Sequence, residues 1–145
     1  MKAFSLNEPY ASAIAYGHKT IETRSRLLSS KVEGERIAIH ASKRRDHEAI
    51  IDLADKIDFP ITPGYVVATA EVTWIAKVIS HPRGGYARLE DWRIKGVYLD
   101  VPIDVWGDYS VGRWIFSLGC VTRIEPIPAK GMLGTWEWAA PWEGK

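Results

Sequence analysis

Gly17 to Ser25 reads GHKTIETRS, and this stretch determines the fold that the sequence predicts. It follows the segment YASAIAY, whose apolar residues recur at the three-to-four-residue spacing of a short helix. Gly17 is well placed just beyond the end of that helix, because glycine adopts the left-handed backbone conformation there without steric cost. The chain is therefore expected to leave a helix at Gly17 and to enter a segment in which Lys19, Glu22 and Arg24 lie close together.

If residues 20–24 form a strand, the charged side chains of this segment share one face. Side chains alternate along a strand, so Glu22 and Arg24 point one way and Thr23 points the other. A salt bridge between Glu22 and Arg24 is then expected, with Lys19 at the corner between helix and strand. Two interpretations remain open: a ligand site in which Lys19 grips a phosphate or a carbonyl, and a structural ion pair in the first barrel strand.

The 145 residues, 46% of them hydrophobic, predict one folded domain that spans residues 1–145. No apolar run approaches the ~20 residues that a membrane-spanning helix requires, and the first residues lack the pattern of a signal peptide. Cys120 is the single cysteine, which excludes an internal disulfide and a cysteine zinc site. His18, His47 and His81 show no metal-ligand spacing. We therefore expect a cytoplasmic protein with no membrane contact, no metal and no cofactor.

Positive charge is concentrated in the early part of the chain. The net charge is only +1, but residues 17–45 hold eight Lys or Arg against three Glu, a net of +5 that leaves −4 for the rest. Such a segment suggests an anionic partner, and a merely solvated surface is the alternative. Lys43, Arg44 and Arg45 are expected to open a second helix, capped by Ser42, and to contact phosphate there.

Short strands dominate the remainder of the sequence. Apolar and β-branched runs predict strands at residues 36–42, 65–79 and 113–128, and the second is long enough to require a bend or bulge. Residues 80–105 are polar and contain Gly84-Gly85, so they are interpreted as a loop or lid with one helical turn. With two helices near the start, this order predicts an α+β fold that is mainly β, a small and partly closed barrel decorated by helices.

Gly17, Lys19, Glu22 and Arg24 match the whole G-x-K-x-x-E-x-R signature of ASCH domains, which belong to the PUA-like superfamily. The chain resembles this family over most of its length, because RIAIHASK, GYVVATAEV and IEPIPAKGMLGTWEW follow the signature as the family's later blocks do. Residues 80–105 match least well. The resemblance implies a PUA-like β-barrel with helices between the early strands, and a cleft lined by the signature and by polar residues of the long strand.

The resemblance implies several functions. Related PUA-like domains bind RNA or modified bases, some ASCH-like proteins are amidohydrolases that deacylate N4-acetylcytidine, and another has been described as a ribonuclease. By position, Lys19 and Glu71 match the lysine and the glutamate that the amidohydrolases use. Those enzymes carry threonine where this chain has Glu22, and a carboxylate does not replace a hydroxyl nucleophile or donor. Weak or absent deacylation of N4-acetylcytidine is therefore expected here.

Three hypotheses for the function follow. A binding module that recognises RNA or a modified nucleobase is the leading one, a small hydrolase that uses Lys19 and Glu71 is the second, and a protein-interaction domain is the third. His40 ends a strand, where it either reaches the same cleft or is a packed structural residue. The residues expected to bind the ligand are Gly17, Lys19, Glu22, Arg24, His40, Lys43, Arg44 and Arg45.

Overall fold

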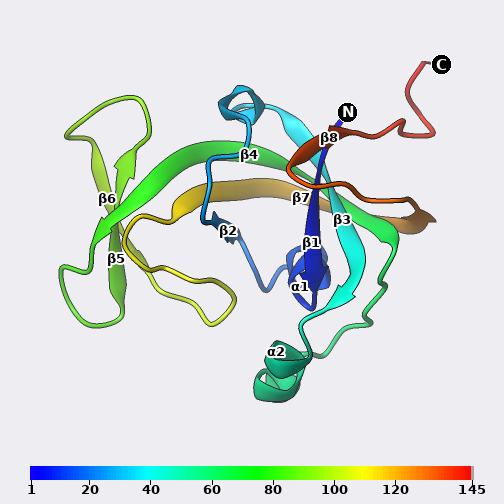
Figure 1. Ribbon diagram of the computed structural model, residues 1–145, viewed down its shortest axis with the longest axis horizontal. Coiled ribbons are helices and arrows are strands. Elements are labelled where there is room, and N and C mark those ends of the chain that lie inside the picture. The colour runs from blue at the N-terminus through cyan, green and yellow to red at the C-terminus, as the bar shows by residue number, and fades with distance from the viewer. Residues whose placement is uncertain (145) are drawn as a thin grey trace.

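Two long strands, β4 (Tyr65–Ser80) and β7 (Trp114–Pro128), pair with each other along the molecule in the computed structural model, which describes residues 1–144 (Figure 1). The register between them shifts at three places. Each shift inserts an irregularity that bends the pair and increases its twist. The bend or bulge that the length of the second predicted strand requires is thus confirmed.

The remaining strands are β1 (Lys2–Glu8), β2 (Ile21–Arg24), β3 (Arg36–Arg45), β5 (Tyr86–Asp91), β6 (Tyr98–Pro102) and β8 (Thr135–Glu137). The sheet has the order β2-β7-β4-β3-β1-β8, with β5 attached to β4 and β6 attached to β5. β1 and β3 are parallel, and the other pairs are antiparallel. The sheet curls into a half-barrel (Figure 1), which confirms the predicted α+β, mainly β fold.

Apolar side chains on the inner face of the half-barrel form the main core. α1 (Tyr10–Ala15) packs against this core, and Ile14 is the largest fully buried residue of this helix. The rings of Phe4 and Phe116 meet edge to face, with their centroids 5.5 Å apart. Because Phe4 lies on β1 and Phe116 on β7, this contact joins two strands that are not neighbours in the sheet.

Specific contacts position both ends of α1. The Glu8 carboxylate accepts a hydrogen bond from the backbone N–H of Ser12 (2.8 Å), which satisfies a free donor of the first turn. At the other end Gly17 has a φ of +82°, and the backbone N–H of Lys19 donates to the carbonyl of Ala13 (3.1 Å). The predicted role of Gly17 beyond the helix is confirmed, and the turn delivers Lys19 to the interior.

The second helix begins later than the sequence predicts. β3 runs on to Arg45 rather than ending near Ser42, because Arg45 pairs with Glu8 of β1. Asp46 then caps α2 (His47–Asp52), since its carboxylate accepts a hydrogen bond from the backbone N–H three residues on (3.0 Å). The three consecutive cations that were expected to open the helix therefore end a strand.

No helix within residues 1–144 is long and apolar enough to cross a membrane. Two single-turn 3-10 helices lie at Ser30–Val32 and Ala54–Lys56.

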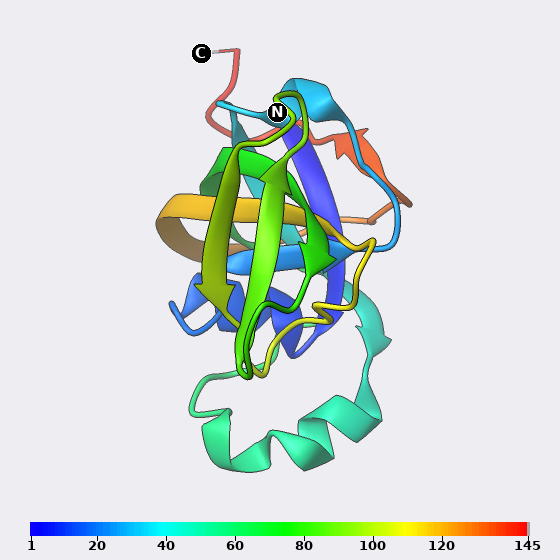
Figure 2. The ribbon, with the colours of Figure 1, turned by 90° about the vertical axis from the view of Figure 1, so that its left-hand side faces the viewer.

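Residues 80–105 form a hairpin rather than the predicted loop or lid. β5 and β6 pair over five residue positions, and the hairpin stands at one end of the molecule in Figure 1, the end that faces the viewer in Figure 2. A bidentate ion pair joins Arg88 to Asp100 across the two strands, with its shorter contact at 2.8 Å. The polar residues that suggested a loop thus stabilise strand pairing, which explains the error.

Candidate functional site

The carboxylate of Glu22 is held from both sides by cations of the same segment. Lys19 is 1% exposed, and its Nζ lies 3.4 Å from Oε1 of Glu22. The Nε–H of Arg24 donates to Oε2 of Glu22 at 2.6 Å, which confirms the predicted salt bridge. Lys19 also donates to the backbone carbonyl of Trp106 (2.9 Å). The buried charges therefore have partners, as a low-dielectric site requires.

The alternation of β2 sets these directions. Glu22 is paired with Phe116 of β7, so its side chain points toward the inner face of the half-barrel. Thr23 points the other way, and its hydroxyl accepts a hydrogen bond from the backbone N–H of Asp108 (3.0 Å). β2 thereby fixes Glu22 on one side and the loop at residues 105–108 on the other.

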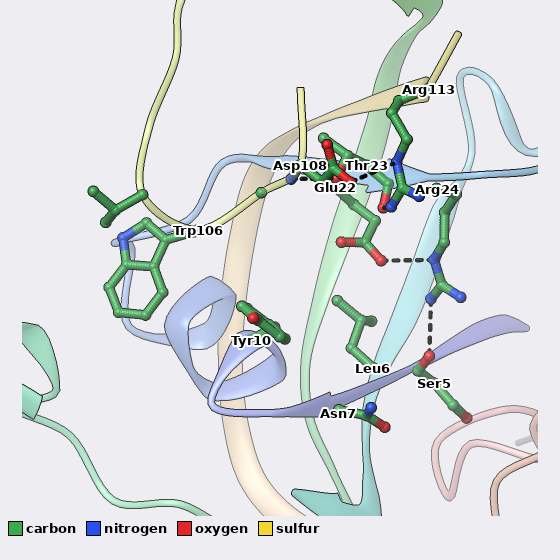
Figure 3. Close-up of a pocket in the computed structure, with 12 residues that line it drawn as sticks. Ser5, Leu6, Asn7, Tyr10, Glu22, Thr23, Arg24, Trp106, Asp108 and Arg113 are labelled. Carbon is green, nitrogen blue, oxygen red and sulfur yellow. Dashed lines mark hydrogen bonds and ion pairs between the residues drawn. The ribbon is translucent and has the colours of Figure 1, made fainter. Parts of the chain in front are cut away.

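Arg24 joins two strands that the sheet keeps apart. Its Nη2 donates to the backbone carbonyl of Ser5 on β1 (2.8 Å), while its Nε binds Glu22 (Figure 3). β1 and β2 are not hydrogen-bonded neighbours in the sheet. Arg24 therefore bridges the open side of the half-barrel and closes one end of the space between the two strands.

A cavity of about 410 Å³ lies between β1, β2 and the loop at residues 105–108. We call it the signature cavity, because Glu22 and Arg24 line it (Figure 3). Lys19 is not among the lining residues and reaches the cavity only through its contact with Glu22. Sequence reasoning missed the rest of its wall, since only the fold brings these segments together. The lining residues are Ser5, Leu6, Asn7, Tyr10, Glu22, Thr23, Arg24, Val105, Trp106, Gly107, Asp108 and Arg113.

The wall of the signature cavity carries both charge signs. Asp108 accepts hydrogen bonds from Ser110, which hold the pKa of the Asp108 carboxyl below its usual value, and Nε of Arg113 lies 3.9 Å from Asp108 Oδ2. The hydroxyl of Tyr10 donates to Asp46 (3.1 Å), and burial raises the pKa of Tyr10 to about 12. The cavity thus offers carboxylate acceptors, guanidinium donors and an un-ionised phenol.

A second hollow, of about 1100 Å³, adjoins the first and shares Ser5, Asn7 and Arg24 with it. We call it the basic groove, because its lining contains cations and, among the described residues, no carboxylate. Lys43 and Arg44 line it as expected for an anion contact, whereas Arg45 does not. The lining residues are Ser5, Asn7, Arg24, His40, Ser42, Lys43, Arg44, Gly64 and residues 128–134.

His40 lines the basic groove but is engaged in a structural network. It is 1% exposed, and its Nε2–H donates to the carbonyl of Ala129 (2.8 Å), so its Nδ1 accepts from the hydroxyl of Ser5 (3.0 Å). The indole of Trp136 donates to the same hydroxyl (3.0 Å). Burial lowers the pKa of His40, which keeps the ring neutral. The ring ties the segment at residues 128–134 to β1 and β3.

The structure does not bring Glu71 to the signature cavity. Its neighbours Ala70 and Val72 are fully buried in the core, so the Glu71 side chain points to the outer face of β4. There it is 46% exposed and lies 3.7 Å from Arg36. The expected convergence of Lys19 and Glu71 in one cleft is therefore wrong, because the polar face of this strand faces outward.

The histidines and the cysteine are dispersed. His18 contacts Asp58 (2.9 Å), and His81 contacts the carbonyl of Tyr109 (2.7 Å). Within residues 1–144, no group of three or more His, Cys, Asp or Glu side chains is placed to hold a metal ion. Cys120 is exposed and has a free thiol.

Comparison with known proteins gives a fold relationship. No family model matches the chain, and no curated protein matches it. Among solved structures, ASCH from Zymomonas mobilis aligns with 97% of this chain and 87% of its own, at 18% identity and a TM-score of 0.55. Two point mutants of ZmASCH align with TM-scores of 0.53 and 0.52, at 17% and 18% identity, over 97% of this chain and 90% and 88% of theirs. The chain therefore has the fold of an ASCH protein.

Proposed function

We propose that this chain is an ASCH-type binding module that recognises an RNA base or a modified nucleobase in the signature cavity. The observation that carries this proposal is the carboxylate of Glu22, which Lys19 and Arg24 hold at the wall of an open cavity. A fixed carboxylate accepts hydrogen bonds from an exocyclic amino group or a ring N–H, and a guanidinium donates to a carbonyl. The ligand is thus expected to present both donors and an acceptor on one edge.

The size and chemistry of the cavity support a nucleobase. Its volume of about 410 Å³ lies within the ~300–1,000 Å³ typical of small-molecule sites. Tyr10 adds an aromatic wall to the polar groups, and an aromatic contact contributes about 1–3 kcal/mol per stacked base. The Trp106 indole is buried and packs against Phe59 instead. A base that has left its stack and entered the cavity has an unpaired Watson–Crick edge, which can face Glu22.

Binding is better supported than catalysis. A nucleophile needs a free hydroxyl or amine beside a base. Lys19 is committed to the Trp106 carbonyl and to Glu22, the Tyr10 hydroxyl donates to Asp46, and the Thr23 hydroxyl accepts from a backbone N–H. Glu71, the second residue of the hydrolase hypothesis, lies on the outer face of β4. No observation therefore favours the hydrolase.

The proposal is tested by replacing Glu22 with Gln and measuring nucleoside and short-RNA binding by calorimetry. Glu22→Gln converts one acceptor oxygen to a donor and should weaken binding of the recognised base by about 1–3 kcal/mol. Glu71→Gln removes the same charge on the outer face and should bind as the native chain does.

Asn7→Ala provides a second variant at the exposed rim, because Glu22→Gln leaves Lys19 buried beside a neutral group. It should retain the native melting temperature and weaken binding. If folded Glu22→Gln and Asn7→Ala bind every nucleoside and RNA as the native chain does, the signature cavity is not the site.

A further inference from the structure

We infer that the ligand is a phosphorylated nucleotide in a single strand or free in solution, with its base in the signature cavity and its phosphate in the basic groove. This inference rests on the proposed function and assigns the ligand class of that same site. Three observations carry it: the continuity of the two hollows, the unpaired cations of the groove and the contacts that hold one wall of the groove.

The two hollows are continuous at Arg24. Ser5, Asn7 and Arg24 belong to the lining of both. Arg24 is already held by Glu22 on the cavity side and by the Ser5 carbonyl, so its guanidinium has a defined position between them. A ligand that fills the cavity beside Arg24 therefore projects its remaining part into the groove.

The groove holds cations that lack partners. Lys43, Arg44 and Lys130 line it, and in the described part of the chain their side chains have no hydrogen bond or ion pair. Some cations outside the groove have acidic partners, such as Arg88 with Asp100 (2.8 Å) and Arg93 with Glu33 (2.6 Å). What distinguishes the groove is that its three unpaired cations line one hollow whose described lining holds no carboxylate. Unpaired like charges in one hollow repel each other, and an anion relieves that repulsion. Phosphate is the anion that a nucleotide supplies.

One wall of the groove is held at Ala129 and Gly131 before any ligand arrives. The segment at residues 128–134 is tied down by the His40–Ala129 hydrogen bond (2.8 Å) and by the backbone N–H of Ala129, which donates to Gly64 (3.0 Å). Gly131 lies so close to the Ser5–His40 pair that an added Cβ would lie 2.5 Å from the His40 ring. A preformed groove reduces the ordering cost of binding.

The walls of the signature cavity favour single strands over duplexes. The cavity is bounded by β1, β2 and the loop at residues 105–108, so a base must leave its stack to enter it. Extruding a base is more costly from a duplex, where it must be unpaired and unstacked, than from a single strand. The basic groove can then follow the backbone of the strand on one side of the extruded base.

The experiment compares five probes by calorimetry at one salt concentration: a nucleoside, its monophosphate, a short single-stranded RNA, the same RNA in a duplex, and inorganic phosphate. The monophosphate or the single strand should bind at least about tenfold more tightly than the nucleoside. The duplex should bind less tightly than the strand. If the single-stranded RNA binds more tightly than the monophosphate, the phosphate belongs to a polymer. If the two bind with equal affinity, the ligand is a free nucleotide.

The double variant Lys43→Ala/Arg44→Ala should remove the gain from phosphate and leave nucleoside affinity unchanged. For the strand, the slope of log affinity against log salt should fall by about 0.7 per lost contact. The control is Arg88→Ala/Lys95→Ala, which removes two cations from the β5–β6 hairpin and should change neither quantity.

Failure of the inference differs from failure of the proposed function. If the nucleoside and the monophosphate bind equally and Lys43→Ala/Arg44→Ala has no effect, the inference is wrong and the proposed function stands. Inorganic phosphate that binds as tightly as the monophosphate would also overturn the inference, because the groove would then act without the cavity. If none of the nucleosides and RNAs binds, both are wrong.

Discussion

At the scale of single residues, the site depends on charged and polar side chains that the fold buries and pairs with one another. Lys19 and Glu22 are buried together, and Arg24 completes the pairing. The sequence predicted these three residues because their spacing places them at one corner and on one strand face. It did not place Glu71, because a polar strand face points either to a cleft or to solvent, and sequence alone does not choose between them.

The burial of His40 predicts a pH dependence of the stability of the folded chain. Burial lowers the pKa of His40 below the ordinary 6.5 in the folded chain, so the unfolded chain binds more protons near that pH. The contribution of the neutral His40 ring to the free energy of unfolding is complete above pH 6.5. It is lost as the pH falls from 6.5 toward the lower pKa of His40 in the folded chain. Protonated Nδ1 also stops accepting from Ser5.

The measurement is urea unfolding at about pH 7.5 and about pH 5.5 for the native chain and for His40→Gln. The native chain should lose more unfolding free energy between these two pH values than His40→Gln does. Carboxylates contribute equally to both proteins, so the difference reports His40. Equal losses in the two proteins would show that His40 is not held neutral by the fold.

At the scale of elements, Glu8 joins three parts of the chain. It is fully buried at the end of β1, and its carboxylate accepts hydrogen bonds from the backbone N–H and hydroxyl of Ser12 in α1 and from the backbone N–H of Thr62 (2.9 Å). Asp46 reaches the same corner, because its N–H donates to the carbonyl of Glu8 (2.8 Å). The approach of β1, α1 and the segment before β4 therefore depends on one side chain.

Glu8→Ala should lower the free energy of unfolding by about 3 kcal/mol or more, because it leaves buried donors without an acceptor. Glu125→Ala on the exposed surface is the matched control and should lie within about 0.5 kcal/mol of the native chain. Chemical denaturation of both variants measures the difference. A Glu8→Ala chain as stable as the control would mean that water replaces the carboxylate in this corner.

The elements also show where sequence reasoning succeeded. The strand at residues 113–128 and the long second strand were predicted because both are rich in apolar and β-branched residues. The start of α2 was missed, because strand pairing between Arg45 and Glu8 extends β3 through three cations. The hairpin at β5 and β6 was missed since its strands are short and partly polar, and their pairing is visible only across the turn.

At the scale of the whole molecule, the site is assembled from segments far apart in sequence. β1 and β2 supply one part of the signature cavity, and the loop at residues 105–108 supplies another (Figure 3). The basic groove adds the end of β3 and the segment at residues 128–134. The sequence signature could mark only the β2 part, because the other walls are set by the curl of the sheet.

The most direct test of the account is an NMR titration of the ¹⁵N-labelled chain with the nucleotide or RNA that binds it best. We predict that the amide signals that move most belong to β1 around Ser5 and Asn7, to β2 around Glu22 and Arg24, and to the loop at residues 105–108. Signals of the β5–β6 hairpin should stay in place. Movement confined to that hairpin or to the outer face around Arg36 and Glu71, with the signature cavity unchanged, would contradict the account.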